Sequence, residues 1–104
     1  MQIDNELLSQ CKKNDRKAHF QLYKLCYSTL MKVCLRYKKN KDEAEEALNT
    51  GFMKIVTNLD IYNADIPFDA WIRKIMINTL IDEFRTQVKH KETIIYSDNE
   101  WQME

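Results

Sequence analysis

Residues 68 to 85 form a segment whose apolar side chains recur at steps of three and four, the repeat of one face of an α-helix. The apolar members are Phe68, Trp71, Ile72, Ile75, Met76, Leu80 and Phe84. A helix with such a continuous stripe must bury it against other parts of the protein. On the other side, the same steps align Lys74, Asn78, Asp82 and Arg85. These are groups that can contact phosphates and base edges, although an ordinary solvated face has the same pattern.

The composition favours helices over strands. The 104 residues include one Gly and one Pro, which leaves few positions for the tight turns of a sheet. Residues that favour helix, such as Leu, Lys, Glu, Gln, Met and Ala, are plentiful. A single domain near this length buries only about 65% of the surface that its unfolded chain exposes. We therefore expect an all-α fold, a compact bundle of three to four helices with a thin shared core.

Four helical segments follow from the apolar periodicity and from their start signals. They cover about residues 4 to 12, 15 to 39, 41 to 59 and 68 to 91, the third starting at a capping-box-like pair, Asn40 and Glu43. The stripe of the second helix comprises Phe20, Tyr23, Tyr27, Leu30, Cys34 and Tyr37. Residues 60 to 67 break the helical pattern, with Pro67 in the first turn of the last helix, and residues 92 to 104 are predicted to be a mostly flexible acidic tail.

Charge is segregated along the chain although the formal net charge is zero. Residues 11 to 41 carry ten Lys or Arg and one acid, residues 42 to 46 carry four acids, and residues 92 to 104 carry four acids and no base. Such a distribution can present separate faces to a nucleic acid and to a protein partner, but charge runs on helices are more often solvated surface.

Several functional classes find no support in the residues. The three cysteines show no Cys-x-x-Cys spacing, and with two histidines they make no metal quartet, so we expect reduced thiols and no metal or cofactor. The sequence contains no Gly-rich phosphate loop and no identifiable nucleophile with a base, so it does not indicate an enzyme. No apolar run approaches the length of about 20 residues that spans a bilayer, so we do not expect membrane insertion. We expect a cytoplasmic location.

Three motifs, in order, resemble region 2 of the sigma-70 family of bacterial sigma factors, most closely the extracytoplasmic-function (ECF) subgroup. Residues 15 to 23 resemble the family's Gly-Asp-x-x-Ala-Phe-x-x-Leu-Tyr stretch, and residues 44 to 52 its Ala-Glu-Asp-x-x-Gln-Glu-x-Phe stretch. The third motif is similar to the family's promoter-reading helix and comprises Phe68, Trp71, Ile75, Asn78, Ile81, Asp82 and Arg85. Together the motifs extend over about residues 4 to 91.

The resemblance implies that the last helix and the loop before it hold the melted non-template strand of the minus-ten promoter element, with an unstacked base pocketed by the loop. The residues expected to contact DNA are Tyr62, Asn63, Trp71, Arg73, Lys74 and Asn78. Phe68 is expected to pack in the core, which leaves Tyr62 as the better candidate for a base contact. Asp82 is expected to have a structural role, as an ion pair with Arg85.

The resemblance also implies docking on the clamp helices of the RNA polymerase β′ subunit. The residues expected to make this contact are Arg36, Glu46, Asn49 and Thr50. Asn49 and Thr50 depart from the family's Gln and acidic residue, which weakens this expectation. An anti-sigma factor is a further partner that the resemblance leaves open. The alternative is an all-α protein-interaction domain that binds no nucleic acid.

In domain terms, residues 1 to 91 are expected to be sigma region 2, and residues 92 to 104 an acidic linker toward the family's second domain. That domain is a helix-turn-helix that reads the minus-thirty-five element and is expected shortly after Lys91. Because this chain does not contain it, we expect a fragment of a longer protein rather than a lone region 2.

Overall fold

The computed structural model describes residues 3–98, with side chains for residues 3–88. The chain forms four α-helices and one 3-10 turn: α1 (Asn5–Lys12), α2 (Arg16–Tyr37), α3 (Lys41–Thr57), η1 (Leu59–Ile61) and α4 (Phe68–Asp98). No strand occurs among the described residues. The predicted all-α bundle is therefore confirmed, and η1 occupies the start of the segment that was expected to be a loop.

Three helices begin at polar residues whose side chains accept hydrogen bonds from free backbone N–H groups. Asp4 accepts from the N–H of Glu6 at 2.9 Å, and Asp15 accepts from those of Lys17 and Ala18 at 2.9 and 3.2 Å. Asn40 accepts from the N–H of Glu43 at 2.9 Å, while its own amide donates to the Glu43 carboxylate at 2.9 Å. The expected cap of α3 is thus present, with the glutamate bound to the Asn40 side chain rather than to a backbone N–H.

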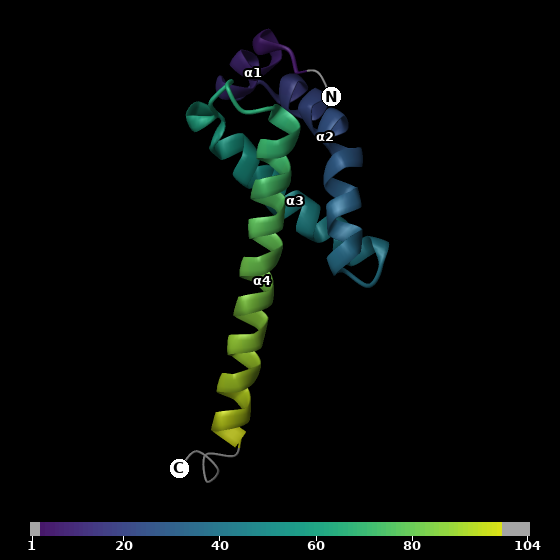
Figure 1. Cartoon of the computed structure of the whole chain (residues 1–104), viewed down its shortest axis with the longest axis vertical. Coiled ribbons are helices and arrows are strands. Elements are labelled where there is room, and N and C mark those ends of the chain that lie inside the picture. The colour runs from purple at the N-terminus through teal and green to yellow at the C-terminus, as the bar shows by residue number, and fades with distance from the viewer. Residues whose placement is uncertain (1–2, 99–104) are drawn as a thin grey trace.

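Helices α2, α3 and α4 pack against one another, and α1 covers one end of this bundle beside η1 and the start of α4 (Figure 1). The centre consists of side chains with no exposed surface: Leu22, Cys26, Leu30 and Cys34 from α2, Ala44, Leu48 and Ile55 from α3, and Ile72 and Met76 from α4. Fully burying a Leu or Ile side chain stabilises a fold by about 1.5–3 kcal/mol. This core fixes the rotation of α4 and therefore decides which of its residues face solvent.

Gly51 of α3 lies against Met76 of α4. A Cβ atom built on Gly51 would lie 2.5 Å from the sulfur of Met76, whose side chain is completely buried. The absence of a side chain at position 51 therefore leaves room for the Met76 side chain between the two helices.

Three aromatic side chains assigned to apolar stripes are exposed instead of buried. Phe20 is 61% exposed, Tyr37 57% and Phe84 65%. Phe20 is exposed although Ala18 and Leu22 are buried, so its side chain lies on the outer side of α2. Tyr37 and Phe84 line one open hollow between α2 and α4 instead of packing in the core. Periodicity predicts that a face is apolar but not how far along the helix a neighbour covers it.

Helix α4 continues beyond the predicted end near residue 91 to Asp98, so part of the expected acidic tail is helical. Residues 99–104 of that tail lie outside the described part of the chain. The lower half of α4 projects from the bundle as a separate rod (Figure 1), which accounts for overall dimensions of 59 × 27 × 25 Å.

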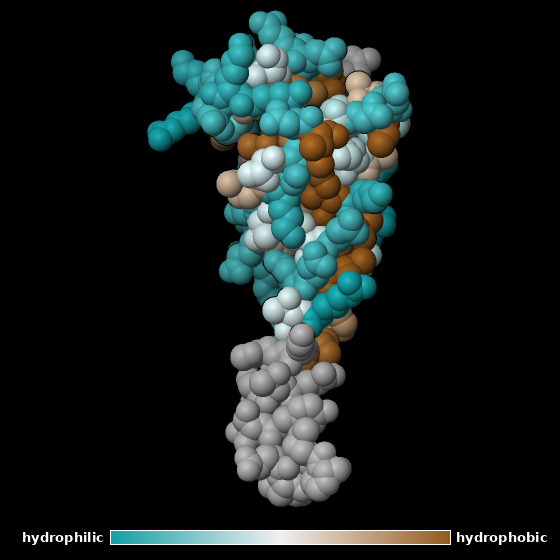
Figure 2. Space-filling model, turned by 90° about the vertical axis from the view of Figure 1, so that its left-hand side faces the viewer, coloured by the Kyte–Doolittle hydropathy of each residue, from teal (hydrophilic) through white to brown (hydrophobic). Residues whose placement is uncertain are grey.

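The face of the molecule shown in Figure 2 is largely hydrophilic, with hydrophobic patches between the polar side chains. None of the helices among the described residues is long and apolar enough to cross a membrane. Among the same residues, no group of three or more metal-ligating side chains comes together.

Candidate functional site

The loop between η1 and α4 is held by three aromatic rings. The ring centroid of Tyr62 lies 5.3 Å from that of Phe68, edge to face, and 4.8 Å from that of Trp71. Phe68 is buried in the core, as expected, whereas Tyr62 and Trp71 are half-buried. The Tyr62 hydroxyl donates to the carbonyl oxygen of Ile66 at 2.6 Å, which ties the end of the loop to its start. Tyr62 therefore shapes the loop and leaves part of its ring accessible.

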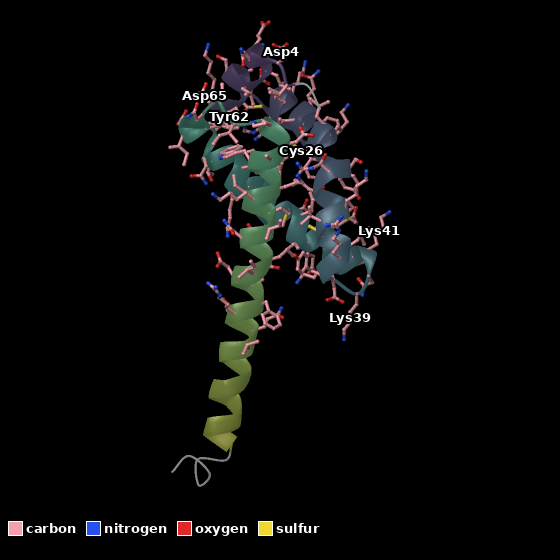
Figure 3. The ribbon with its side chains drawn as sticks, viewed as in Figure 1. Asp4, Cys26, Lys39, Lys41, Tyr62 and Asp65 are labelled. Carbon is pink, nitrogen blue, oxygen red and sulfur yellow. The ribbon has the colours of Figure 1, made fainter. Side chains whose placement is uncertain are left out.

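Asn63 stabilises the turn at the tip of this loop. Its side-chain oxygen accepts from the N–H of Asp65 at 2.9 Å, and its carbonyl oxygen accepts from the N–H of Ile66 at 2.9 Å. Such Asx turns are typical of Asn in tight loops. Residues 63 to 67 are all exposed, and in Figure 3 the Asp65 side chain at the tip lies beside that of Tyr62, next to the start of α4. The loop is compact and accessible from solvent.

Lys74 and Asn78 lie one turn apart on α4, and both are exposed. Neither makes a hydrogen bond or an ion pair with another residue in the part of the chain whose side chains are described. They follow Trp71 by three and seven residues, so the three side chains share one side of the helix. The structure thus brings together the loop, Trp71, Lys74 and Asn78, and we call this set the loop–α4 surface.

Arg73 points away from the loop–α4 surface. Successive residues of an α-helix are rotated by about 100°, which places Arg73 about 140° from Asn78 around the helix. Arg73 instead lines a groove between α2 and α4, opposite Arg36. The sequence interpretation placed these two residues at different interfaces, DNA and polymerase, whereas the structure places them in the same groove.

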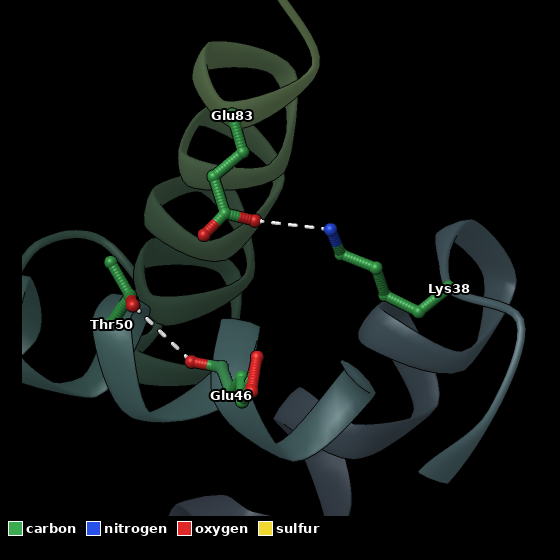
Figure 4. Close-up of polar contacts among 4 residues, drawn as sticks. All are labelled: Lys38, Glu46, Thr50 and Glu83. Atoms are coloured by element: carbon green, nitrogen blue, oxygen red, sulfur yellow. Dashed lines mark hydrogen bonds and ion pairs between the residues drawn. The ribbon is translucent and has the colours of Figure 1, made fainter. Parts of the chain in front are cut away.

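The residues expected to face the polymerase lie on α3, with the exception of Arg36. Glu46, Asn49 and Thr50 are all exposed. The side-chain oxygen of Asn49 accepts from the Tyr23 hydroxyl at 2.8 Å, and the Thr50 hydroxyl donates to the Glu46 carbonyl oxygen at 3.2 Å (Figure 4). These bonds leave the Glu46 carboxylate free to meet a partner, and they orient Asn49 from the neighbouring helix.

A hollow of about 400 Å³ lies between α3 and α4 next to Glu46. Its charged lining comprises Glu43, Glu46, Asp82, Glu83, Lys38 and Lys54, a net charge of −2. The Lys38 ammonium lies 3.3 Å from a solvent-shielded oxygen of Glu83 (Figure 4). This acidic hollow extends the α3 surface onto α4.

Sequence reasoning missed Asp82 and Glu83 as neighbours of Glu46. The expected ion pair between Asp82 and Arg85 is not seen in the described structure; both side chains are exposed. Lys38 and Glu83 pair across 45 positions of sequence. Spacing rules apply within one helix, so only the packing of α4 on α2 and α3 could reveal this contact.

The buried thiols and two tyrosines have pKa values raised by their surroundings. Burial raises the pKa of the Cys26 thiol to about 12 and that of Cys34 to about 11. The Tyr27 hydroxyl donates to the Glu45 carboxylate at 2.6 Å, and this bond is the main cause that raises the Tyr27 pKa to about 12. Protonated thiols are poor nucleophiles and poor metal ligands, so the cysteines have a packing role here.

Comparison with known proteins points in one direction. Residues 22–90 match the family described as Sigma-70 region 2. Over 78 residues the chain is 27% identical to the "ECF RNA polymerase sigma factor SigW" of Bacillus subtilis (strain 168). That alignment covers 75% of this chain and 42% of the relative, so the chain spans less than half of the length of this relative. No solved structure matches.

Proposed function

The chain belongs to the sigma-70 region 2 family, and we propose that it is the part of a sigma factor that joins core RNA polymerase to promoter DNA at the start of transcription. Its activity in this proposal is binding, without cutting or transferring any group. The domain docks on the β′ clamp helices of the polymerase and captures the melted minus-ten element. The loop–α4 surface is the observation that carries the proposal.

The proposed DNA contact combines three kinds of group on the loop–α4 surface. Tyr62 and Trp71 present partly accessible rings, and base stacking on such rings is worth about 1–3 kcal/mol per base. The Asn78 amide offers a donor and an acceptor to a base edge, and Lys74 offers a cation to the adjacent phosphate. Because the loop is preformed by the bonds of Tyr62 and Asn63, little ordering is required on binding.

The test is binding of a single-stranded minus-ten oligonucleotide to the chain in complex with core polymerase, measured by fluorescence anisotropy across a salt series. The oligonucleotide is obtained by selection from a randomised pool. We expect affinity to fall as salt rises and both Asn78→Ala and Lys74→Ala to weaken binding at least ten-fold. Lys39→Ala is the matched control for Lys74→Ala, because Lys39 lies at the opposite end of the bundle from Tyr62 (Figure 3).

Salt-independent binding, with both variants behaving as the parent chain, would contradict the DNA contact. That outcome would favour the other candidate, an all-α protein-interaction domain. A loss in Lys39→Ala as large as that in Lys74→Ala would also count against the proposal, since it would indicate a general effect of net charge.

The proposed polymerase contact uses the exposed α3 surface with Glu46, Asn49 and Thr50, extended by the acidic hollow. Acidic side chains there complement a basic partner and chiefly raise the association rate. We expect Glu46→Lys to slow capture by isolated β′ clamp helices, measured by surface plasmon resonance at low salt. Asp60→Lys makes the same charge change on η1 and should leave capture unchanged; unchanged capture in Glu46→Lys would place the docking surface elsewhere.

A further inference from the structure

The groove between α2 and α4 has positively charged walls and an apolar floor. Lys32 and Arg36 lie one turn apart on α2, and Arg73 faces them from α4. Val33, which is buried, and Ile77, which is half-buried, form the floor between them. The groove encloses about 550 Å³. Cations from two helices thus line the same recess.

The three cations are available to an external ligand. All three side chains are exposed, and within the described structure none of them forms an ion pair or a hydrogen bond. The groove contains one carboxylate, that of Asp69, so its lining carries a net charge of +2. Cations that line one groove repel one another, and an anion bound between them relieves that repulsion.

The two recesses that flank α4 have opposite charge. The recess against α3 carries a net charge of −2, whereas the groove against α2 carries +2. A polyanion is therefore repelled from the recess beside Glu46 and attracted to the groove beside Arg36. Arg73 directly precedes Lys74 in α4, so a strand held by Lys74 needs to turn only about 100° around the helix to reach the groove.

We infer that the α2–α4 groove binds the phosphodiester backbone of DNA, with Lys32 and Arg36 on one wall and Arg73 on the other. The inference rests on the proposed function and extends it to residues on α2. It also reassigns Arg36, which the sequence interpretation gave to the polymerase contact. The guanidinium groups can each form paired hydrogen bonds to phosphate oxygens, and Lys32 adds a point charge.

The test is the salt dependence of non-specific DNA binding by the whole chain without polymerase, measured with labelled duplex and single-stranded oligonucleotides. Each phosphate contact contributes about 0.9 to the slope of log K against log salt for a duplex and about 0.7 for a single strand. Arg36→Gln should therefore reduce the slope by about one and the affinity by about ten-fold at 50 mM salt. The double variant Lys32→Gln with Arg36→Gln should reduce the slope by about two.

Lys39→Gln is the matched control, because it removes the same charge from an exposed lysine outside the groove. The inference is overturned if the double variant has the same salt slope as the parent chain on both forms of DNA. It is also overturned if Lys39→Gln loses as much DNA affinity as Arg36→Gln does. Loss on either duplex or single strand supports it and identifies which form the groove holds. Arg36→Gln must also leave capture by β′ clamp helices unchanged; a loss there would return Arg36 to the polymerase surface.

Failure of this inference is distinguishable from failure of the proposed function. If Asn78→Ala still abolishes minus-ten capture while the groove variants bind as the parent chain does, only the groove is wrong. If neither set of variants matters, the DNA contact itself is wrong.

Discussion

At the scale of single residues, Gly51 leaves room for the buried side chain of Met76. A methyl group at this position would gain about 1 kcal/mol of helix propensity over Gly. It would also collide with the buried side chain of Met76, and overpacking of a core costs about 1–3 kcal/mol. We expect Gly51→Ala to lower the free energy of unfolding by about 1 kcal/mol in urea titrations, the overpacking cost being the larger effect.

A double-mutant cycle with Met76→Leu isolates this contact. Leucine has a similar volume but lacks the sulfur and terminal methyl that would meet the new methyl group, so the double variant should recover at least 0.5 kcal/mol relative to additivity, about the threshold for a real coupling. An increase in stability of the Gly51→Ala single variant would indicate that Met76 moves aside freely.

The Tyr27–Glu45 bond predicts a pH dependence. The Tyr27 pKa is raised from its ordinary value of 10.0 to about 12, so the folded state favours the protonated hydroxyl. Its contribution to stability is complete below pH 10, where the phenol is protonated in both states, and is lost as pH rises through about 12. The difference in urea midpoint between the parent chain and Tyr27→Phe should therefore be constant from pH 8 to 9.5 and shrink from pH 10 to 11.5.

Titration of Cys26 and Cys34 also falls in this range but is common to both chains, so it cancels in the difference. A difference that stays constant up to pH 11.5 would contradict the contribution of this bond. Sequence alone could not predict the pair, because residues 27 and 45 meet only when α2 packs against α3.

At the scale of elements, local signals predicted helix starts well and helix coverage poorly. Asn40 is the cap that the sequence indicated, and α2 starts beside Asp15 where its start was expected, because a helix start depends on neighbours within three residues. The exposure of Phe84 and the continuation of α4 to Asp98 depend instead on where the other helices end. The exposure of Lys74 and Asn78 could be predicted because the apolar stripe of the same helix lies on its other side. The position of Arg73 in one groove with Lys32 and Arg36 could not, because it depends on how α4 packs against α2.

The loop before α4 is predicted to act through its shape. Tyr62→Phe keeps the ring in contact with Phe68 and Trp71 but removes the hydroxyl that bonds the Ile66 carbonyl. An exposed hydrogen bond of this kind contributes about 0.5–1.5 kcal/mol, and here its loss affects mainly the loop. We expect weaker capture of the minus-ten strand with little change in melting temperature.

Asn63→Ala offers a second removal of a loop bond, at the Asp65 N–H, and should act in the same direction. Equal DNA affinity in both variants and the parent chain would show that the loop needs no preformed shape.

At the scale of the whole molecule, the three cysteines report how the bundle opens. Cys11, Cys26 and Cys34 are each at most 1% exposed, and burial is the main cause that raises the pKa of each thiol. Because only the thiolate reacts, labelling by a disulfide reagent at pH 8 should be slow until the fold opens. We expect Cys11 to react first, since the eight-residue α1 contacts only one end of the bundle and can detach alone.

Cys11→Ser provides the control, because its remaining two thiols should react together and at the rate of global unfolding. Rapid labelling of Cys34 in native conditions would mean that α2 separates from α4 without unfolding of the rest.

The rod formed by the second half of α4 couples rotation to length. Its backbone is one uninterrupted helix from the bundle to Asp98, so the angle between Asn78 and Asp98 about the helix axis is fixed. Deleting one residue between positions 88 and 98 would rotate anything joined at Asp98 by about 100° about the helix axis and shift it by only about 1.5 Å along that axis. Deleting seven residues would return its orientation to within about 20° of the original. A change in the length of this helix therefore alters the orientation of whatever follows it much more than its distance from the bundle.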